Sequence, residues 1–159
     1  MALKRYDEAR AVFADQSAIY QRTGRKRDKS WAFTVYNLGK IEYDTKHYDA
    51  AIRQFAEALA LFEAFGEKDH DDIDGTLNMI AACHVIMQRW ALALNTLDRI
   101  APGGRPQTRA VTRFTRGQAL AGLGNAQGVA EARAARAEMA KLEVDPELIG
   151  EADAWLAHR

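Results

Sequence analysis

Apolar residues recur every three or four positions along most of the chain, which predicts a succession of amphipathic helices. Trp31, Val35, Leu38 and Ile41 fall on one face of a first such helix, and residues 48–62 repeat the pattern in a second. Only three prolines interrupt the 159 residues, and alanine, a strong helix former, is frequent. The pattern therefore predicts an all-α chain built from helix pairs.

The pattern returns at a fixed interval of 42 residues. The aromatic residues Tyr6, Tyr48 and Trp90 are separated by this interval. Each is followed three residues later by alanine, and seven residues later by Phe or Leu. These positions are Ala9, Ala51 and Ala93, and Phe13, Phe55 and Leu97. Agreement of three copies at one offset indicates an internal helical repeat.

Turn-forming residues divide the chain into units. Gly24 and Gly66 are expected to end helices, and "APGGRPQ" at 101–107 predicts a turn. We predict one domain, 1–159, with a lone second helix of a half repeat at 5–24, repeats at 28–66, 70–101 and 106–142, and a capping helix at 145–158.

The capping helix has its own start signal. Asp145 is a suitable N-cap and Pro146 fits the first turn. Leu148, Ala152 and Trp155 are expected to line the face that covers the last repeat.

The first helix has no partner helix before it, so we interpret the chain as a piece of a longer array. Its partner-facing residues are expected to be Tyr6, Ala9, Val12 and Phe13. Since an exposed apolar edge favours association, a homo-oligomer through this edge is a further expectation.

The stretch "YNLGKIEYDTKHYDAAIRQFAEALAL" (36–61) resembles the tetratricopeptide repeat. The pattern positions are Leu38, Gly39, Tyr43, Tyr48, Ala51, Phe55 and Ala58. The longer unit is similar to those of kinesin light chains and bacterial regulators. The resemblance implies a right-handed α-solenoid of antiparallel helix pairs with about seven or eight helices.

The charges are balanced, with 22 basic and 22 acidic residues. This gives no global attraction to nucleic acid or to an anionic membrane. The single cysteine, Cys83, excludes an internal disulfide and a cysteine-based zinc site. The composition, the polar start of the chain and the absence of a long apolar run favour a cytoplasmic protein.

The acidic stretch "EKDHDDIDGTL" (67–77) partly fits a calcium loop that begins at His70. Position twelve of that loop is Ala81, which aligns with Gly39 inside a helix, so we expect no metal site. The simpler interpretation is the start of a helix, where acidic side chains interact favourably with the helix dipole. The stretch also aligns with the basic residues 25–29 of the unit before it, which suggests charge pairing between repeats.

Other chemical candidates are weak. Cys83 and His84 are neighbours on a helix and point about 100° apart, so they do not form a nucleophile and base pair. Arg109, Arg113 and Arg116 form a stripe that is either a solvated face or a patch for an acidic partner. We expect no catalytic residue and no cofactor.

The resemblance places the binding residues on the concave face that the first helices of each pair line. In the first unit these are Phe33, Tyr36, Asn37, Lys40, Tyr43 and Asp44. In the second they are Asn78, Met79, Ala82, Val85 and Ile86, and in the third Val111, Phe114, Thr115 and Gln118. Packing between units is the alternative for Met79, Val85 and Ile86.

The expected function is a scaffold for protein–protein interaction, with a peptide or a partner segment bound in this groove. Two alternatives stay open. One is a peptide-sensing regulatory domain of a larger bacterial regulator, and the other is a self-assembling structural module.

Overall fold

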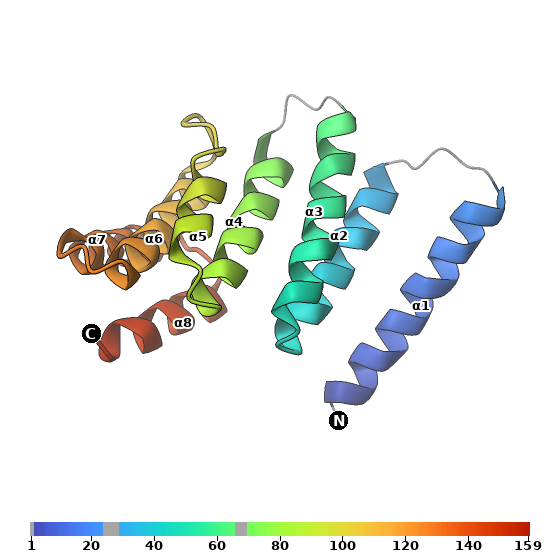
Figure 1. Ribbon diagram of the computed structural model, residues 1–159, viewed down its shortest axis with the longest axis horizontal. Helices are drawn as coiled ribbons and strands as arrows, with labels where there is room; N and C mark the ends of the chain where they lie inside the picture. The colour runs from blue at the N-terminus through green and yellow to red at the C-terminus, as the bar shows by residue number, and fades with distance from the viewer. Residues whose placement is uncertain (1, 24–28, 66–69) are drawn as a thin grey trace. The chain divides into compact units, whose positions relative to one another are not determined.

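The computed structural model describes residues 2–23, 29–65 and 70–159 (Figure 1). These ranges contain eight α-helices and no strand, so the predicted all-α fold of neighbouring helix pairs is confirmed. No helix in them is both long enough and apolar enough to cross a membrane. The predicted helix ends at Gly24 and Gly66 lie outside the described residues. The chain divides into two compact units, Met1–Lys68 and Asp69–Arg159.

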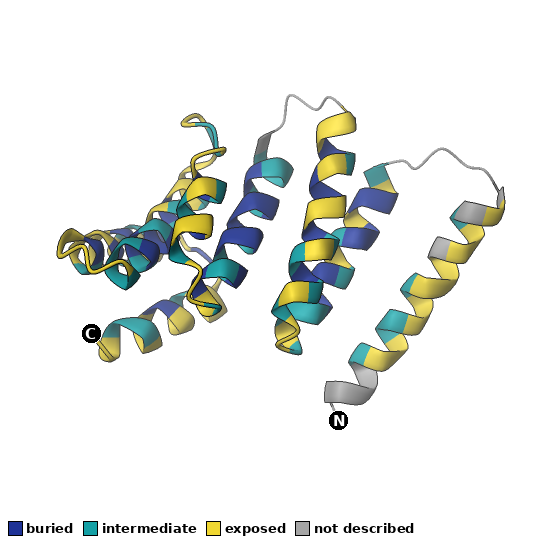
Figure 2. Cartoon of the chain, viewed as in Figure 1, coloured by how far each residue is buried: buried dark blue, intermediate teal, exposed yellow. Residues whose placement is uncertain are grey.

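The first unit consists of one helix followed by a helix pair. Its helices are α1 (Ala2–Thr23), α2 (Lys29–Asp44) and α3 (Tyr48–Ala64). Between α2 and α3 the chain reverses within three residues, where Lys46 adopts the left-handed φ of 65°. Buried residues mark the contact between α2 and α3, whereas α1 is exposed along most of its length (Figure 2).

A small residue sets the distance between α2 and α3. A Cβ added to Gly39 would lie 2.7 Å from ring carbons of Phe55, which is fully buried. In the next repeat Ala81 stands at the position of Gly39 and Leu97 at that of Phe55, and both are buried. From the first repeat to the next, the change from Gly to the larger Ala on one helix accompanies a change from Phe to the smaller Leu on the other. This compensation keeps the packing dense.

The second unit contains two helix pairs and a final helix. Its helices are α4 (His70–Ile86), α5 (Trp90–Leu97), α6 (Pro106–Gly122), α7 (Gln127–Lys141) and α8 (Pro146–Ala157). The pairs are α4 with α5 and α6 with α7. Gln88, in the turn of the first pair, has a φ of 58°, and Gly124, in the turn of the second, has a φ of 80°.

The backbones of α6 and α7 approach each other closely. A Cβ on Gly117 would lie 2.7 Å from the backbone nitrogen of Ala132 and 2.8 Å from the carbonyl oxygen of Gly128. Gly128 faces the backbone of Ala121 in the same way. This contact excludes any side chain at either glycine.

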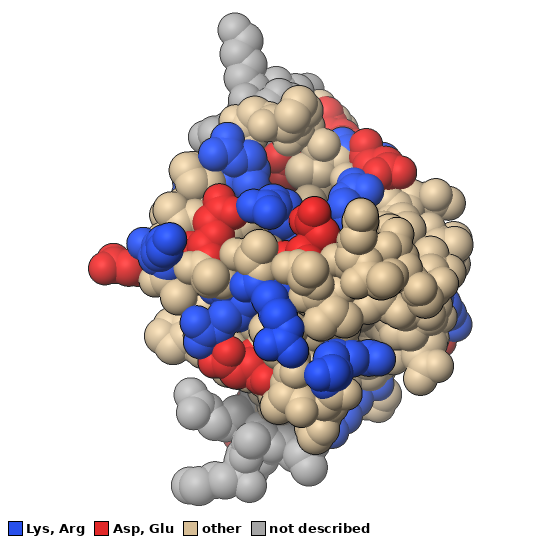
Figure 3. Space-filling view, turned by 90° about the vertical axis from the view of Figure 1, so that its left-hand side faces the viewer, with Lys and Arg blue, Asp and Glu red and all other residues tan. Residues whose placement is uncertain are grey.

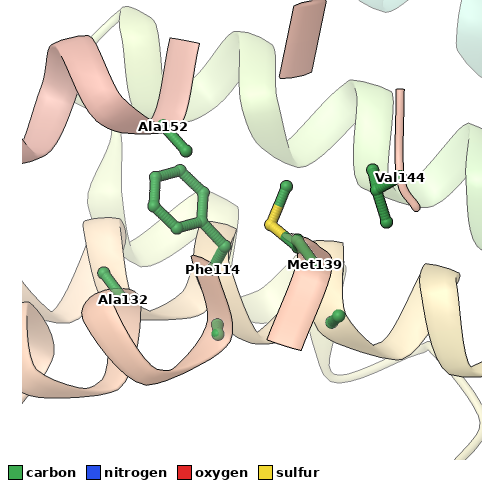
Figure 4. Packing of buried hydrophobic residues seen from close by; sticks show 7 residues of the cluster. Phe114, Ala132, Met139, Val144 and Ala152 are labelled. Atoms are coloured by element: carbon green, nitrogen blue, oxygen red, sulfur yellow. The ribbon is translucent and has the colours of Figure 1, made fainter. Parts of the chain in front are cut away.

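Helix α8 covers the apolar side of the last pair. Phe114, Ala132, Met139, Val144 and Ala152 meet in one buried cluster (Figure 4). The cluster therefore draws on α6, α7 and α8, and the ring of Trp155 closes it by an edge-to-face contact with Phe114 at 5.8 Å between centroids.

The start of α8 follows the sequence prediction except at one position. The carboxylate of Asp145 accepts a hydrogen bond of 2.9 Å from the backbone N–H of Glu147, which confirms the N-cap. Leu148, expected on the covering face, is 38% exposed. Ile149 packs against the cluster in its place.

Gly117→Ala tests the close approach of α6 and α7. The added methyl group meets backbone atoms that cannot rotate away, so we expect the free energy of unfolding to fall by about 1–3 kcal/mol. Urea unfolding followed by circular dichroism measures it. Gly150→Ala is the matched control, because a Cβ there meets nothing within 4 Å. It should stabilise the helix by up to about 1 kcal/mol, and equal effects of the two substitutions would contradict the packing argument.

Candidate functional site

The outer face of α2, defined by Phe33, Asn37, Lys40 and Asp44, is exposed along its whole length. The four positions follow a 4-3-4 spacing and therefore share one side of the helix. The opposite side of α2 is buried against α3. Four of the six residues predicted for the first unit thus lie together on one accessible surface.

Phe33 is the large apolar residue of this outer face, and 39% of its surface is exposed. Its ring packs edge-on against Phe62 of α3, with 5.1 Å between the ring centroids. The ammonium nitrogen of Lys29 lies 5.6 Å from the centre of the Phe33 ring, within the range of a cation–π contact. The ring is therefore held in place while part of it faces solvent.

Tyr36 and Tyr43 are oriented differently from the other predicted residues of α2. The ring of Tyr36 lies 5.3 Å from that of Phe55, and the ring of Tyr43 lies 5.7 Å from that of Tyr48. Both tyrosines are half-buried. They attach α2 to α3, and only part of each ring is accessible.

One end of the outer face of α2 is in contact with α1. The hydroxyl of Tyr6 donates a hydrogen bond of 3.4 Å to Asp44. Arg10 donates two hydrogen bonds of 3.1 Å to Glu42 and one of 3.2 Å to Thr45. The carboxylate of Asp44 is thus already engaged from within the chain, unlike the middle of the face.

The residues predicted to form the N-terminal edge do not act as one surface. Tyr6 is bound to α2, and Ala9 and Phe13 are half-buried. Val12 is 57% exposed. The four predicted residues therefore do not share one exposed side of α1, because three of them are half-buried and Val12 is exposed.

In the second unit, Asn78 and Phe114 are not surface residues. Asn78 is 6% exposed, and its amide donates a hydrogen bond of 2.9 Å to Thr112, which joins α4 to α6. Phe114 is 7% exposed because Trp155 of α8 covers it. Both side chains are therefore buried, and both serve packing in this structure.

The other predicted residues of the second unit are divided between core and surface. Met79, Ala82 and Gln118 are half-buried. Val85 belongs to a buried cluster, which confirms the packing interpretation for it, whereas Ile86 is 43% exposed. In the third repeat Val111 packs against the core and Thr115 is buried.

From His70 onward, the acidic stretch forms the start of a helix. Helix α4 begins at His70, so Asp71, Asp72 and Asp74 lie in its first turns and do not form a calcium loop. Asp71 forms an ion pair with Arg105 in the connector before α6. No group of three or more His, Cys, Asp or Glu in the described parts of the chain is arranged to hold a metal ion.

The proposed charge pairing between repeats lies partly outside the described residues, since Arg25, Lys26 and Arg27 are among those the structure does not describe. Within the second unit the acidic side has a different partner. Asp71 reaches Arg105, which follows it in sequence, because the connector folds back beside the start of α4.

The arginine stripe of α6 is mostly paired with acidic residues. Arg113 donates a hydrogen bond of 2.6 Å to Glu138 of α7, and Arg116 donates one of 2.7 Å to Asp98. Arg109 is exposed. Basic and acidic side chains are interspersed on the face shown in Figure 3. The stripe connects neighbouring elements and is not a uniform basic patch.

Arg136 of α7 and Asp153 of α8 form a bidentate pair, with two hydrogen bonds of 2.6 Å. These hydrogen bonds lower the pKa of the Asp153 carboxyl below its ordinary value. They raise the pKa of the Arg136 guanidinium. The pair fastens the last helix to the one before it.

A model of the tetratricopeptide repeat family matches residues 31–103. The match begins in α2 and extends through α5 into the connector that follows. No match was found among curated proteins or among solved structures. Repeats of this family generally mediate protein–protein interactions.

The ion pair between Arg136 and Asp153 predicts how the titration of Asp153 changes when its partner is removed. Because the folded pKa of Asp153 is lowered, its stabilising contribution is present above the unfolded value of about 3.9 and is lost as the pH falls through the folded value. In Arg136→Ala the carboxyl of Asp153 should titrate at a higher pH than in the unmodified chain. NMR of labelled aspartate measures this titration.

Arg133→Ala is the control for this titration, since Arg133 is an exposed arginine on the same helix. It should leave the titration of Asp153 unchanged. A similar shift in both variants would mean that general charge, and not the hydrogen-bonded pair, sets the pKa.

Proposed function

We propose that this chain, which is of the tetratricopeptide repeat type over residues 31–103, binds a segment of a partner protein on the outer face of α2. The repeat type supports protein–protein interaction in general. The choice of surface rests on the side chains of α2 themselves.

The observation that carries the proposal is the exposed and fixed ring of Phe33. Water contacts 39% of this residue, although Phe62 and Lys29 hold its ring. Covering an aromatic ring of this kind is favourable. Because the ring is already immobilised in the free protein, binding costs little side-chain entropy.

The polar neighbours of Phe33 provide the means to orient a bound segment. The amide of Asn37 both donates and accepts hydrogen bonds, as the backbone of an extended peptide requires. Lys40 adds a positive charge one turn further along the same face. A partner segment with an apolar side chain opposite Phe33 and an acidic group near Lys40 fits this arrangement.

Helix α2 is a suitable base for such a surface. Its buried side is fixed by the contact of Gly39 with Phe55, and two further aromatic contacts attach it to α3. Binding groups on a rigid helix keep their geometry better than groups on loops. The balanced charge of the chain also favours a protein partner over a nucleic acid.

Phe33→Ala combined with Asn37→Ala tests the surface. Peptides are first selected on the unmodified full chain from a random library displayed on phage, and their affinities are then measured by fluorescence anisotropy. Loss of a central aromatic anchor costs about 2 kcal/mol or more, so the dissociation constant should rise by about 30-fold or more.

Arg53→Ala on α3 serves as the control, because it changes an exposed residue on the other helix of the same pair. It should bind the selected peptides with unchanged affinity, and circular dichroism should show equal helicity in all three proteins. Peptides that bind the double variant as tightly as the unmodified chain would exclude the outer face of α2 as the binding surface.

A further inference from the structure

The outer seam of α1, defined by Glu8, Val12, Asp15, Ile19 and Arg22, points away from α2. Tyr6, Arg10 and Tyr20 form the side that contacts α2, through hydrogen bonds to Asp44 and Glu42 and a ring contact of 5.1 Å with Trp31. The seam residues are all exposed, with 57% of Val12 and 47% of Ile19 accessible.

The spacing of the outer seam is that of a two-helix contact. Its positions follow one another at intervals of four, three, four and three residues, the a/d pattern of coiled coils. Two β-branched residues occupy it seven residues apart. Ala11 and Ala18, also exposed, flank the seam and leave room for a second helix to approach.

We propose that a second copy of this chain covers the outer seam, in an antiparallel contact between the two α1 helices with its two-fold axis at Asp15. In this arrangement residue n of one copy faces residue 30 − n of the other. Val12 then packs on Ala18 of the second copy and Ile19 on its Ala11. Each large side chain meets a small one, and the contact is the same from both sides, as two-fold symmetry requires.

Charge complementarity favours a second copy of this chain as the partner, and the antiparallel direction for the contact. The antiparallel arrangement places Glu8 of each copy opposite Arg22 of the other, which gives two attractive pairs. A parallel arrangement would oppose Glu8 to Glu8 and Arg22 to Arg22. Within the described parts of the chain, neither Glu8 nor Arg22 forms an ion pair. Both are therefore available for these contacts.

Two features limit the strength of the contact. Asp15 meets Asp15 of the second copy at the axis, and this repulsion opposes association. Helix α1 has 22 residues and a length of about 33 Å, so the interface falls in the small class typical of weak complexes. The proposal is therefore a reversible dimer that forms at high concentration, independent of peptide binding on α2.

Sedimentation equilibrium of the full chain, from about 1 µM to about 1 mM at low salt, tests the proposal. We expect a monomer–dimer equilibrium. Val12→Gln with Ile19→Gln should abolish the dimer, because it removes the apolar seam but keeps helix-forming side chains. Leu92→Gln, at a residue of α5 that is 49% exposed, is the matched control and should leave the dimer intact.

Charge variants distinguish this contact from any other use of α1. Arg22→Glu should weaken the dimer several-fold, because it turns two attractions into repulsions, and adding Glu8→Arg should restore it. Asp15→Asn should strengthen association. A chain that stays monomeric throughout, a dimer unaffected by the Val12 and Ile19 substitutions, or a charge swap without rescue would each overturn the proposal.

Circular dichroism of every variant checks that α1 stays helical, so that loss of association is not loss of structure. A dimer that breaks instead on Gly150→Arg would place the contact on α8, where a Cβ at Gly150 meets open space, and would also overturn the assignment to α1.

Discussion

The close contact between the two helices of a pair governs the rest of this structure. Where α2 meets α3, the absence of a side chain at Gly39 lets the ring of Phe55 lie against the backbone. Where α6 meets α7, Gly117 and Gly128 let backbone face backbone. Dense packing of this kind leaves little freedom to rotate either helix. Which side chains face the core and which face solvent is decided at these glycines.

The candidate binding surface follows from that constraint. Because Gly39 turns one side of α2 toward α3, the side with Phe33, Asn37 and Lys40 is turned outward. The aromatic residues next to this side, Tyr36 and Tyr43, fill the space between the helices and hold the arrangement. An exposed ring on a fixed helix is thus a by-product of tight pairing, and it is the feature on which a partner protein can act.

Charged residues add polar contacts between elements that apolar contacts also join. Arg10 reaches from α1 to Glu42 of α2, Arg116 reaches Asp98, and Arg136 reaches Asp153 of α8. Such pairs are individually weak at an exposed surface. Their main contribution is to specificity, since each pair fixes one element beside a particular neighbour. The zero net charge of the chain is distributed over such local pairs, which explains why the arginines of α6 do not form a basic patch.

The sequence alone determined the helical class and the repeat interval, because both depend on local periodicity. It also placed Phe33, Asn37 and Lys40 on one side of a helix. That side is exposed in the structure, and a binding role for it stays a prediction. Only the tertiary structure showed that Asn78 joins α4 to α6 and that α8 covers Phe114. It also showed that Asp71 pairs with Arg105. In each case the partner lies in another element, so the spacing within one helix carries no record of it.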